Sequence, residues 1–299
     1  MPNGILLVDK PAGVTSHTVV AMARRALKTK KVGHAGTLDP MATGLLVLGV
    51  GASTRLLTFM VGADKTYEAT ITLGASTVTD DAEGDVTETA DASSLTMDAI
   101  RAAVAPLSGE IEQVPSAVSA IKVDGTRAYA RVRGGEDVEL KARSVTVSRF
   151  DLDNFQAGDR AHVDAVIDCS SGTYIRALAR DLGASLGVGG HLSALRRTHV
   201  GAFHVAEAVM ADEITADALI DPVAAIEKFL PVAELTAESA QLLRNGRRPD
   251  SDITGLVAAV RDGTLIGIAR GQSGNLVPVA NMPEETQGRQ QNEGSENAS

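Results

Sequence analysis

Tryptophan is absent from the sequence, and the other large aromatic residues are scarce: three tyrosines and five phenylalanines occur among 299 residues. The core must therefore be mainly aliphatic, and a site that stacks an aromatic ring on a nucleobase has few candidates. The single cysteine, Cys169, excludes an internal disulfide, a zinc site built on paired cysteines and an iron–sulfur cluster. One cysteine is typical of a reducing compartment.

Long hydrophobic runs are also missing. No stretch of eighteen apolar residues occurs, so we expect no transmembrane helix, and the N-terminus lacks the basic and apolar segments of a signal peptide. We therefore expect a cytoplasmic protein. With 44% hydrophobic and 22% charged residues the chain has an ordinary globular composition, which excludes collagen-like, coiled-coil and wholly disordered classes. Its length suits about two domains.

The net charge of −10 argues against a nucleic-acid partner, but the charges are unevenly distributed. Residues 1–60 contain seven Lys or Arg against two Asp, and residues 113–200 contain twelve against ten acidic residues. Acidic residues are concentrated in 77–112, in 205–240 and near the C-terminus. This pattern fits a basic RNA-binding face, and it equally fits an ordinary solvated surface.

Hydrophobic patterning predicts both strands and helices, because apolar runs of strand length and amphipathic segments of helical spacing both occur along the chain. The expected strands are 4–8, 45–50, 67–73, 119–123, 138–147, 163–167 and the extended segment 192–205. The expected helices are one capped by Ser16, a short one capped by Ser53, and residues 97–107 and 173–186. The polar, acidic segment 75–94 is expected to be a surface loop or hairpin.

The sequence predicts a domain boundary near residue 230, with a larger domain in residues 1–230. In residues 231–282 a short helix precedes three short strands separated by glycine-containing turns, which predicts a compact β module. Residues 283–299 are rich in Glu, Gln, Asn, Gly and Ser, and we expect them to form a disordered acidic tail.

The most unusual segment is the loop from Gly33 to Pro40. Gly33 and Gly36 bracket His34 and permit backbone conformations that other residues avoid. Pro40 pushes the backbone of Asp39 out of the helical region. An Asp before Pro usually forms a turn or caps a helix, and a histidine in a glycine-rich loop is usually structural. The loop alone therefore does not establish a catalytic site.

The longer phrase around this loop is more specific. Residues 33–46 read Gly-His-Ala-Gly-Thr-Leu-Asp-Pro-Met-Ala-Thr-Gly-Leu-Leu. Other segments of the same kind are Gly-Ile-Leu-Leu-Val-Asp-Lys-Pro-Ala-Gly-Val-Thr-Ser at 4–16, Lys-Thr-Tyr-Glu-Ala at 65–69, Val-Pro-Ser and Ser-Ala-Ile-Lys-Val-Asp-Gly within 114–125, and Gly-Thr-Tyr-Ile-Arg with Asp-Leu-Gly within 172–183. Together they resemble the TruB-type pseudouridine synthases, in the expected order, over about residues 4–205.

This resemblance implies a fold and a reaction. It implies an α+β fold: a catalytic domain with a mixed, largely antiparallel sheet and flanking helices, and a small PUA-like RNA-binding domain at residues 231–282. The implied reaction converts uridine 55 in the T-loop of tRNA to pseudouridine: the base is flipped out, the C1′–N1 glycosidic bond breaks, and the uracil turns and rejoins through C5. No redox change or group donor takes part, so we expect no cofactor and no metal.

The resemblance also assigns roles to residues. Asp39 matches the catalytic aspartate, and Arg176 matches the arginine that pairs with it. A carboxylate can attack the base, attack C1′ or abstract a proton, and the sequence leaves these routes open. Tyr67 matches the tyrosine that stacks on the target base. The other expected substrate-binding residues are His34, Tyr174, Leu195, Lys10, Arg196 and Arg197.

These roles compete with simpler ones. Tyr67, Tyr174 and Leu195 also fit a plain hydrophobic core, and Arg176 also fits an ordinary surface. His34 is expected to enter the T-loop where the flipped base leaves it. Lys10, together with Pro11, is expected to brace the active-site loop, while Arg196 and Arg197 are expected to contact phosphate groups.

Several functions remain open on the sequence. The same fold with a guide RNA typically carries long basic extensions, and this chain has an acidic tail instead, so we favour a stand-alone monomer that binds the T-arm stem-loop of tRNA, with no guide RNA and no membrane. An accessory role as a tRNA-folding chaperone can coexist with catalysis. An acidic protein that never binds RNA is the last alternative, and the salt dependence of tRNA binding separates it.

Overall fold

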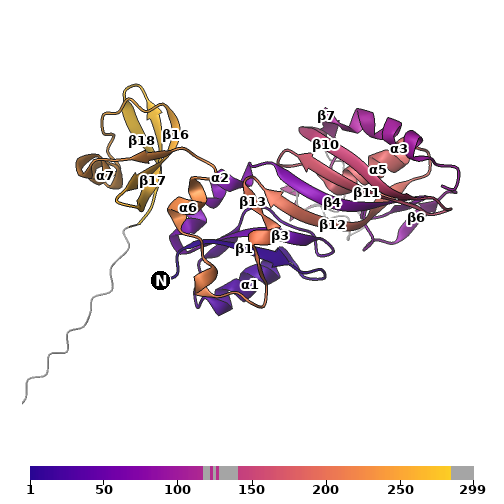
Figure 1. The fold of residues 1–299 in the computed structure, drawn as a ribbon, viewed down its shortest axis with the longest axis horizontal. Coiled ribbons are helices and arrows are strands. Elements are labelled where there is room, and N and C mark those ends of the chain that lie inside the picture. Colours follow the sequence, from indigo (N-terminus) through magenta and orange to yellow (C-terminus); the bar gives the residue numbers. More distant parts are fainter. Residues whose placement is uncertain (117–121, 124–125, 128–140, 284–299) are drawn as a thin grey trace, which may run out of the picture. The chain divides into compact units, whose positions relative to one another are not determined.

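The computed structural model describes residues 1–116, 122–123, 126–127 and 141–283. The chain divides into two compact units, Met1–Phe229 and Leu230–Ser299. Helices and strands combine as expected for the α+β class (Figure 1). In the described part of the chain, no helix is long and apolar enough to cross a membrane. Parts of the expected strands at 119–123 and 138–147, and the expected tail beyond residue 283, lie outside the described residues.

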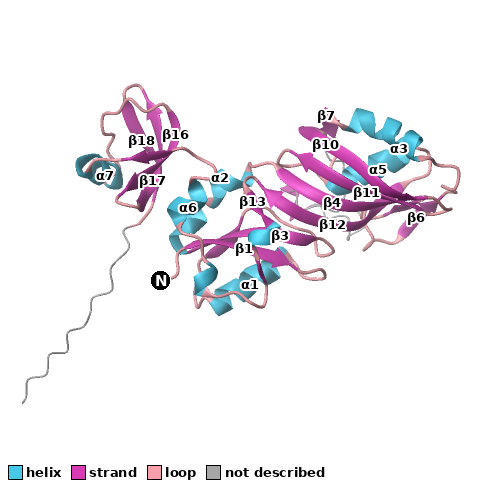
Figure 2. Cartoon of the chain, in the orientation of Figure 1, coloured by secondary structure: helices cyan, strands magenta, loops and turns pink. Residues whose placement is uncertain are grey.

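A ten-stranded sheet forms the framework of the first unit (Figure 2). Its path runs β14–β1–β3–β12–β4–β11–β10–β7, with β13 paired to β12 and β2 paired to β3. β1–β14 and β3–β12 are parallel, and the other pairs along this path are antiparallel, which confirms a mixed, largely antiparallel sheet. The strands are β1 (Gly4–Lys10), β2 (Val32–His34), β3 (Thr43–Val50), β4 (Lys65–Leu73), β7 (Gly109–Gln113), β10 (Arg143–Gln156), β11 (Ala161–Cys169), β12 (Gly190–Val200), β13 (Phe203–His204) and β14 (Val209–Met210).

Side-chain alternation explains how helices cover this sheet. Tyr67, Ala69 and Ile71 of β4 are buried on one face, whereas Glu68 between them is exposed. That buried face joins a hydrophobic cluster with α3 (Met97–Val104) and α5 (Ile175–Ser185). A second cluster lies where α1 (Ser16–Ala26) packs against β1 and β3. The Gly33–Pro40 loop connects the two clusters.

Two expected helix caps are wrong. Thr15 caps α1, because its hydroxyl oxygen accepts a hydrogen bond from the Thr18 amide at 3.0 Å. The Ser16 hydroxyl is buried instead, and it donates to the Leu38 carbonyl at 3.0 Å and accepts from the Leu38 amide at 2.9 Å. Ser53 lies inside the 3₁₀ helix η1 (Gly51–Arg55), where its hydroxyl donates to Asn3 Oδ1 at 2.9 Å.

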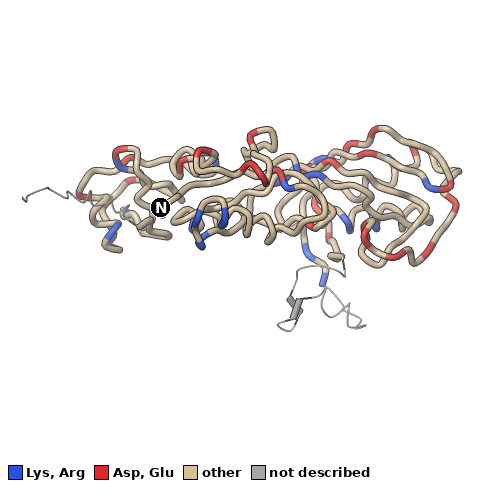
Figure 3. Tube along the Cα trace, turned by 90° about the horizontal axis from the view of Figure 1, so that it is seen from below, with Lys and Arg blue, Asp and Glu red and all other residues tan. Residues whose placement is uncertain are grey.

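The segment 75–94 contains the expected hairpin, β5 (Ala75–Thr77) paired with β6 (Val86–Thr89). The expectation of a purely surface segment is wrong for the turn between the strands, because Asp80 and Asp81 are buried. Most other acidic residues of this segment remain at the surface, and the trace in Figure 3 has many acidic positions along the end of the unit that holds β6 and α3.

The second unit is a four-stranded sheet in the order β15–β16–β17–β18, packed against α7. Its elements are β15 (Val232–Glu234), α7 (Ala237–Arg244), β16 (Gly255–Arg261), β17 (Thr264–Gln272) and β18 (Asn275–Asn281). The helix and three of the strands match the sequence-based expectation, while β15, which pairs in parallel with β16, was not expected. The remaining elements of the first unit are α2 (Leu57–Val61), η2 (Ala105–Leu107), β8 (Lys122–Val123), β9 (Thr126–Arg127), η3 (Val205–Glu207), η4 (Ala216–Ala218) and α6 (Pro222–Ile226).

Candidate active site

One cavity collects most of the residues singled out in the sequence. It has a volume of about 260 Å³ and is bounded by the Gly36–Asp39 loop, β4, β12 and the start of α5. The expected site residues on its wall are Asp39, Tyr67, Tyr174, Arg176, Leu195 and Arg197. His34, Lys10 and Arg196 are not on this wall. The residues come from segments far apart in the sequence, so the fold is what assembles them.

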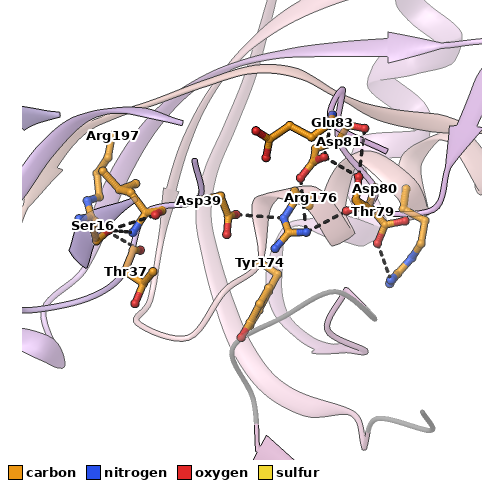
Figure 4. A network of polar contacts seen from close by, with 12 residues as sticks. Ser16, Thr37, Asp39, Thr79, Asp80, Asp81, Glu83, Tyr174, Arg176 and Arg197 are labelled. Carbon is orange, nitrogen blue, oxygen red and sulfur yellow. Dashed lines mark hydrogen bonds and ion pairs between the residues drawn. The ribbon is translucent and has the colours of Figure 1, made fainter. Parts of the chain in front are cut away.

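Asp39 and Arg176 form an ion pair at the centre of this site (Figure 4). Arg176 Nε lies 3.0 Å from Asp39 Oδ2, the guanidinium side chain is 6% exposed, and the carboxylate side chain is 36% exposed. Arg176 is the second residue of α5, which begins shortly after a turn at Ser171–Gly172. The pair therefore presents an accessible carboxylate held by a buried cation.

The guanidinium of Arg176 is shared with a second carboxylate that the sequence analysis missed. Arg176 Nη1 lies 3.4 Å from Asp81 Oδ2 and donates to the Thr79 carbonyl at 2.8 Å. Asp81 is itself fixed, because Oδ1 accepts from the Thr79 hydroxyl at 2.5 Å and from the Glu83 amide at 3.0 Å. Figure 4 shows these contacts converging on Arg176 from the turn of the β5–β6 hairpin.

A parallel contact is made one helical turn further along α5. Arg180 Nη1 lies 3.3 Å from Asp80 Oδ2, and Arg180 Nε lies 2.9 Å from Asp181 Oδ1. Burial raises the pKa of the Asp80 carboxyl above its ordinary value, which Arg180 partly counteracts. Arg176 and Arg180 are four residues apart on one amphipathic helix, and this spacing is the sequence feature that is consistent with carboxylates on the facing segment.

Tyr67 on β4 lies beside Arg197 on the neighbouring strand β12, because the two residues are register partners. Burial raises the pKa of the Tyr67 phenol, so the side chain is neutral at physiological pH. Leu195 is the register partner of Ala69 on the same two strands and adds an apolar surface to the cavity. These residues give the cavity an aromatic and aliphatic side next to the Asp39–Arg176 pair.

Arg197 differs from the expectation of a phosphate contact. Its side chain is buried, and it donates to backbone carbonyls: from Nε to Leu45 at 2.8 Å, from Nη1 to Thr37 at 3.4 Å and from Nη2 to Gly36 at 3.3 Å. A guanidinium enclosed in this way braces the Asp39 loop through the backbone carbonyls of Gly36 and Thr37. Arg196, the next residue, points away from the cavity and forms a two-point ion pair with Asp9 at 3.1 and 2.6 Å.

Lys10 was expected to brace the loop and to belong to the substrate-binding residues, and the contacts of its side chain in the structure are with the loop backbone. Its side chain is fully buried, and Nζ donates to the carbonyls of Pro11, Val14 and Pro40 at 2.9, 2.7 and 3.1 Å. Burial lowers the pKa of this ammonium group to about 8. The hydrogen bond to Pro40 fixes the residue that follows Asp39.

His34 ends β2 at the start of the loop that carries Asp39. Its ring packs edge-on against His17 of α1, with the ring centres 5.5 Å apart. Burial lowers the pKa of His34, so the imidazole is neutral at pH 7. The ring is only half-buried, and the structure places it beside the loop rather than in the cavity wall.

Tyr174 is positioned by a buried amide. The Tyr174 amide donates to Gln113 Oε1 at 2.8 Å, and Gln113 Nε2 donates back to the Tyr174 carbonyl at 3.1 Å. The guanidinium carbon of Arg143 lies 4.6 Å from the centre of the Tyr174 ring. Among the described residues, no group of His, Cys, Asp and Glu side chains is arranged to hold a metal ion.

Comparison with known proteins identifies the family of the chain. A family model for "TruB family pseudouridylate synthase (N terminal domain)" matches residues 24–175, and one for "tRNA pseudouridylate synthase B C-terminal domain" matches residues 176–230. A protein from Arthrobacter sp. (strain FB24) named tRNA pseudouridine synthase B is 51% identical over 294 residues, which cover 93% of this chain and 96% of the relative. A protein of the same name from Cutibacterium acnes is 53% identical over 277 residues, covering 90% and 94%.

Solved structures support the same fold. The chain in a structure described as an H/ACA RNP bound to a substrate RNA containing 2′-deoxyuridine aligns with a TM-score of 0.70 at 22% identity, covering 94% of this chain and 85% of that one. A chain from a Cbf5–Nop10–Gar1 complex aligns with a TM-score of 0.68 at 24% identity, covering 94% and 84%. The family models and the close relatives carry the assignment beyond the fold: the chain belongs to the TruB family of pseudouridylate synthases.

Proposed function

We propose that this protein converts uridine to pseudouridine in tRNA, with uridine 55 of the T-loop as its target. The observation that carries the proposal is the Asp39–Arg176 ion pair, in which an accessible carboxylate is held by a buried guanidinium beside Tyr67 in one cavity. Relatives named tRNA pseudouridine synthase B that match more than nine-tenths of this chain support the choice of substrate.

The cavity suits a uracil that has left its base stack. The neutral ring of Tyr67 offers a face on which the base stacks, and Leu195 offers an apolar contact. Asp39 then lies beside the base and its ribose, oriented by Arg176. Since the carboxylate alone among these groups combines accessibility with nucleophilic or basic character, it carries the chemistry.

The reaction is an isomerisation, and its atoms balance without a second substrate. The C1′–N1 bond breaks, the uracil turns in the cavity, and a C1′–C5 bond forms. C5 loses its proton, and N1 gains one. Asp39 assists by attack on the base, by attack on C1′ or by removing a proton from the sugar, and the positions of Asp39 and Arg176 are compatible with all three routes.

The proposed substrate unit is the T-arm stem-loop. A hairpin loop yields a base more readily than a duplex does, because its bases are already partly unstacked. We propose that residues 1–230 form the catalytic domain and act as a monomer without a guide RNA. The unit at 231–282 is proposed to be a PUA-like RNA-binding domain, supported by its small sheet and single helix.

The deciding experiment uses unmodified tRNA transcripts. Wild-type protein, Asp39→Asn protein and buffer are incubated with the transcript, and pseudouridine is mapped by chemical labelling. Pseudouridine at position 55 with wild-type protein alone supports the proposal, and its absence from every uridine contradicts it. Pseudouridine at another position would support the proposed activity and contradict uridine 55 as its target. A tRNA-refolding assay with the Asp39→Asn protein separately tests the chaperone role.

A further inference from the structure

Among the described residues, four cationic side chains line the proposed catalytic cavity: Lys65, Arg143, Arg176 and Arg197. Three of them have their polar hydrogens directed at protein acceptors. Arg176 faces carboxylates, Arg197 faces backbone carbonyls, and Lys65 Nζ donates to the carbonyls of Val61 and Ala63 at 3.1 and 2.5 Å. These three are therefore committed to holding the site together.

Arg143 is arranged differently. Its Nη2 atom is buried and has no hydrogen-bond partner among the described residues. A charged donor without an acceptor is costly to bury, and such groups often mark the place of a missing ligand. The Tyr174 ring lies under the guanidinium at 4.6 Å, which fixes the plane of the group without using its N–H bonds. Arg143 thus lines the cavity with a guanidinium that is stacked on Tyr174 and has one nitrogen, Nη2, for which the described residues supply no acceptor.

The surroundings of Arg143 leave room for a ligand. Gly172 has a φ of +93°, and a Cβ atom built on it would lie 3.8 Å from Arg143 Nη1. A larger residue there would adopt a strained backbone and place its side chain beside the guanidinium. The glycine therefore keeps space beside the N–H groups, and Asp39 is the only carboxylate that the described residues contribute to this cavity.

We infer that Arg143 binds a backbone phosphate adjacent to the target nucleotide. The inference rests on the proposed function, because it takes the ligand to be RNA. The phosphodiester is the anion that RNA supplies, and a planar guanidinium binds it through two parallel hydrogen bonds. With the phosphate held at Arg143 and the base stacked on Tyr67, the ribose between them is placed near Asp39.

A purely structural role for Arg143, as support for the Tyr174 ring, is the competing explanation. Arg143→Met separates the two, since methionine keeps an apolar chain on the ring and removes the charge. Arg143→Lys restores the charge without the planar fork. Arg149→Met is the matched control: Arg149 lies on the same strand β10, pairs with Asp151 and does not line the cavity.

The test is a double-mutant cycle that combines a substitution of Arg143 in the protein with removal of one phosphate charge in the RNA. T-arm hairpins carry an uncharged methylphosphonate in place of the phosphate on the 5′ or the 3′ side of the target uridine. Equilibrium dissociation constants are measured by filter binding in an Asp39→Asn background, so that no turnover occurs. A guanidinium–phosphate contact worth about 1.5–3 kcal/mol corresponds to roughly a tenfold to hundredfold change in the dissociation constant.

We expect Arg143→Met to weaken binding of the normal hairpin by that factor and to reduce the slope of log K against log salt by about 0.7–0.9. At one of the two positions, methylphosphonate should weaken RNA binding by the protein that keeps Arg143, by the same factor as the Arg143→Met substitution does. The same methylphosphonate should not change RNA binding by the Arg143→Met variant. Arg143→Lys should recover the salt slope, and Arg149→Met should change neither quantity. Additive effects at both positions would overturn the inference. Failure of wild-type protein to form pseudouridine in normal RNA would instead overturn the proposed function.

Discussion

Asp81 offers the sharpest test of how the active site is organised, because it orients Arg176 without lining the cavity. We predict that Asp81→Asn slows pseudouridine formation tenfold to a hundredfold and changes RNA affinity little. At 3.4 Å and an effective dielectric of 20, the attraction to Arg176 is about 5 kcal/mol before desolvation is subtracted. Breaking a buried pair typically costs about 3–5 kcal/mol. Arg176 retains Asp39 and the Thr79 carbonyl, so we expect about 2 kcal/mol, within the tenfold-to-hundredfold range.

The neighbouring carboxylate provides the control. Asp80 lies next to Asp81 in the same turn and is also buried, but it pairs with Arg180 instead of Arg176. Asp80→Asn should lower the stability measured by urea unfolding and leave the rate within about threefold. The rate is measured with enzyme in excess, from the release of tritium at C5 of labelled uridine in tRNA. Equal rates for Asp81→Asn and wild type, or equal losses for the two variants, would refute this account of Arg176.

Three further predictions address the proposed catalytic carboxylate Asp39, the proposed stacking ring of Tyr67 and the loop brace Lys10. Asp39→Asn should abolish tritium release while tRNA binding, measured by filter binding, stays within a few-fold. Tyr67→Leu should slow the reaction by at least a hundredfold and Tyr67→Phe should keep the affinity for tRNA, as gel-shift titration would show. Lys10→Met should destabilise the protein by about 2–4 kcal/mol in urea unfolding, since three buried carbonyls lose their donor. The pKa of Lys10 is about 8 in the folded protein and 10.5 ordinarily, so between these pH values the unfolded chain binds more protons than the folded protein. The difference in free energy of unfolding between wild type and Lys10→Met should therefore widen as the pH rises from 8 to 10.

The sequence predicted the strands and helices of the first unit well where hydrophobic periodicity decides the structure. β4, β11 and α5 lie close to their expected positions because each buries one face in a shared cluster. Caps were less predictable: Thr15 and Ser16 are both good capping residues, and the choice between them depends on a tertiary contact to Leu38.

Charged residues show why the site could be predicted only in part. Arg196 and Arg197 are adjacent and both basic, so the sequence alone predicted the same phosphate contact for both. On a strand, successive side chains point to opposite faces, which places Arg196 beside Asp9 and Arg197 inside the protein. Asp81 was missed for the converse reason, because an acidic turn gives no sign in sequence that one of its carboxylates is buried against a helix.

The buried cations explain how a glycine-rich loop can hold the proposed catalytic residue in one position. Loops of this composition are conformationally permissive, whereas Asp39 must be held within a fraction of an ångström of its substrate. Backbone groups on both sides of Asp39 are fixed by side chains from other elements: those of Gly36 and Thr37 by Arg197, that of Leu38 by Ser16, and that of Pro40 by Lys10. The glycines allow the backbone to turn, and the hydrogen bonds from the buried side chains restrict the turn to one conformation. The position of Asp39 therefore depends on side chains that hydrogen-bond to the loop backbone, so part of the segment that resembles the family supports the proposed catalytic carboxylate.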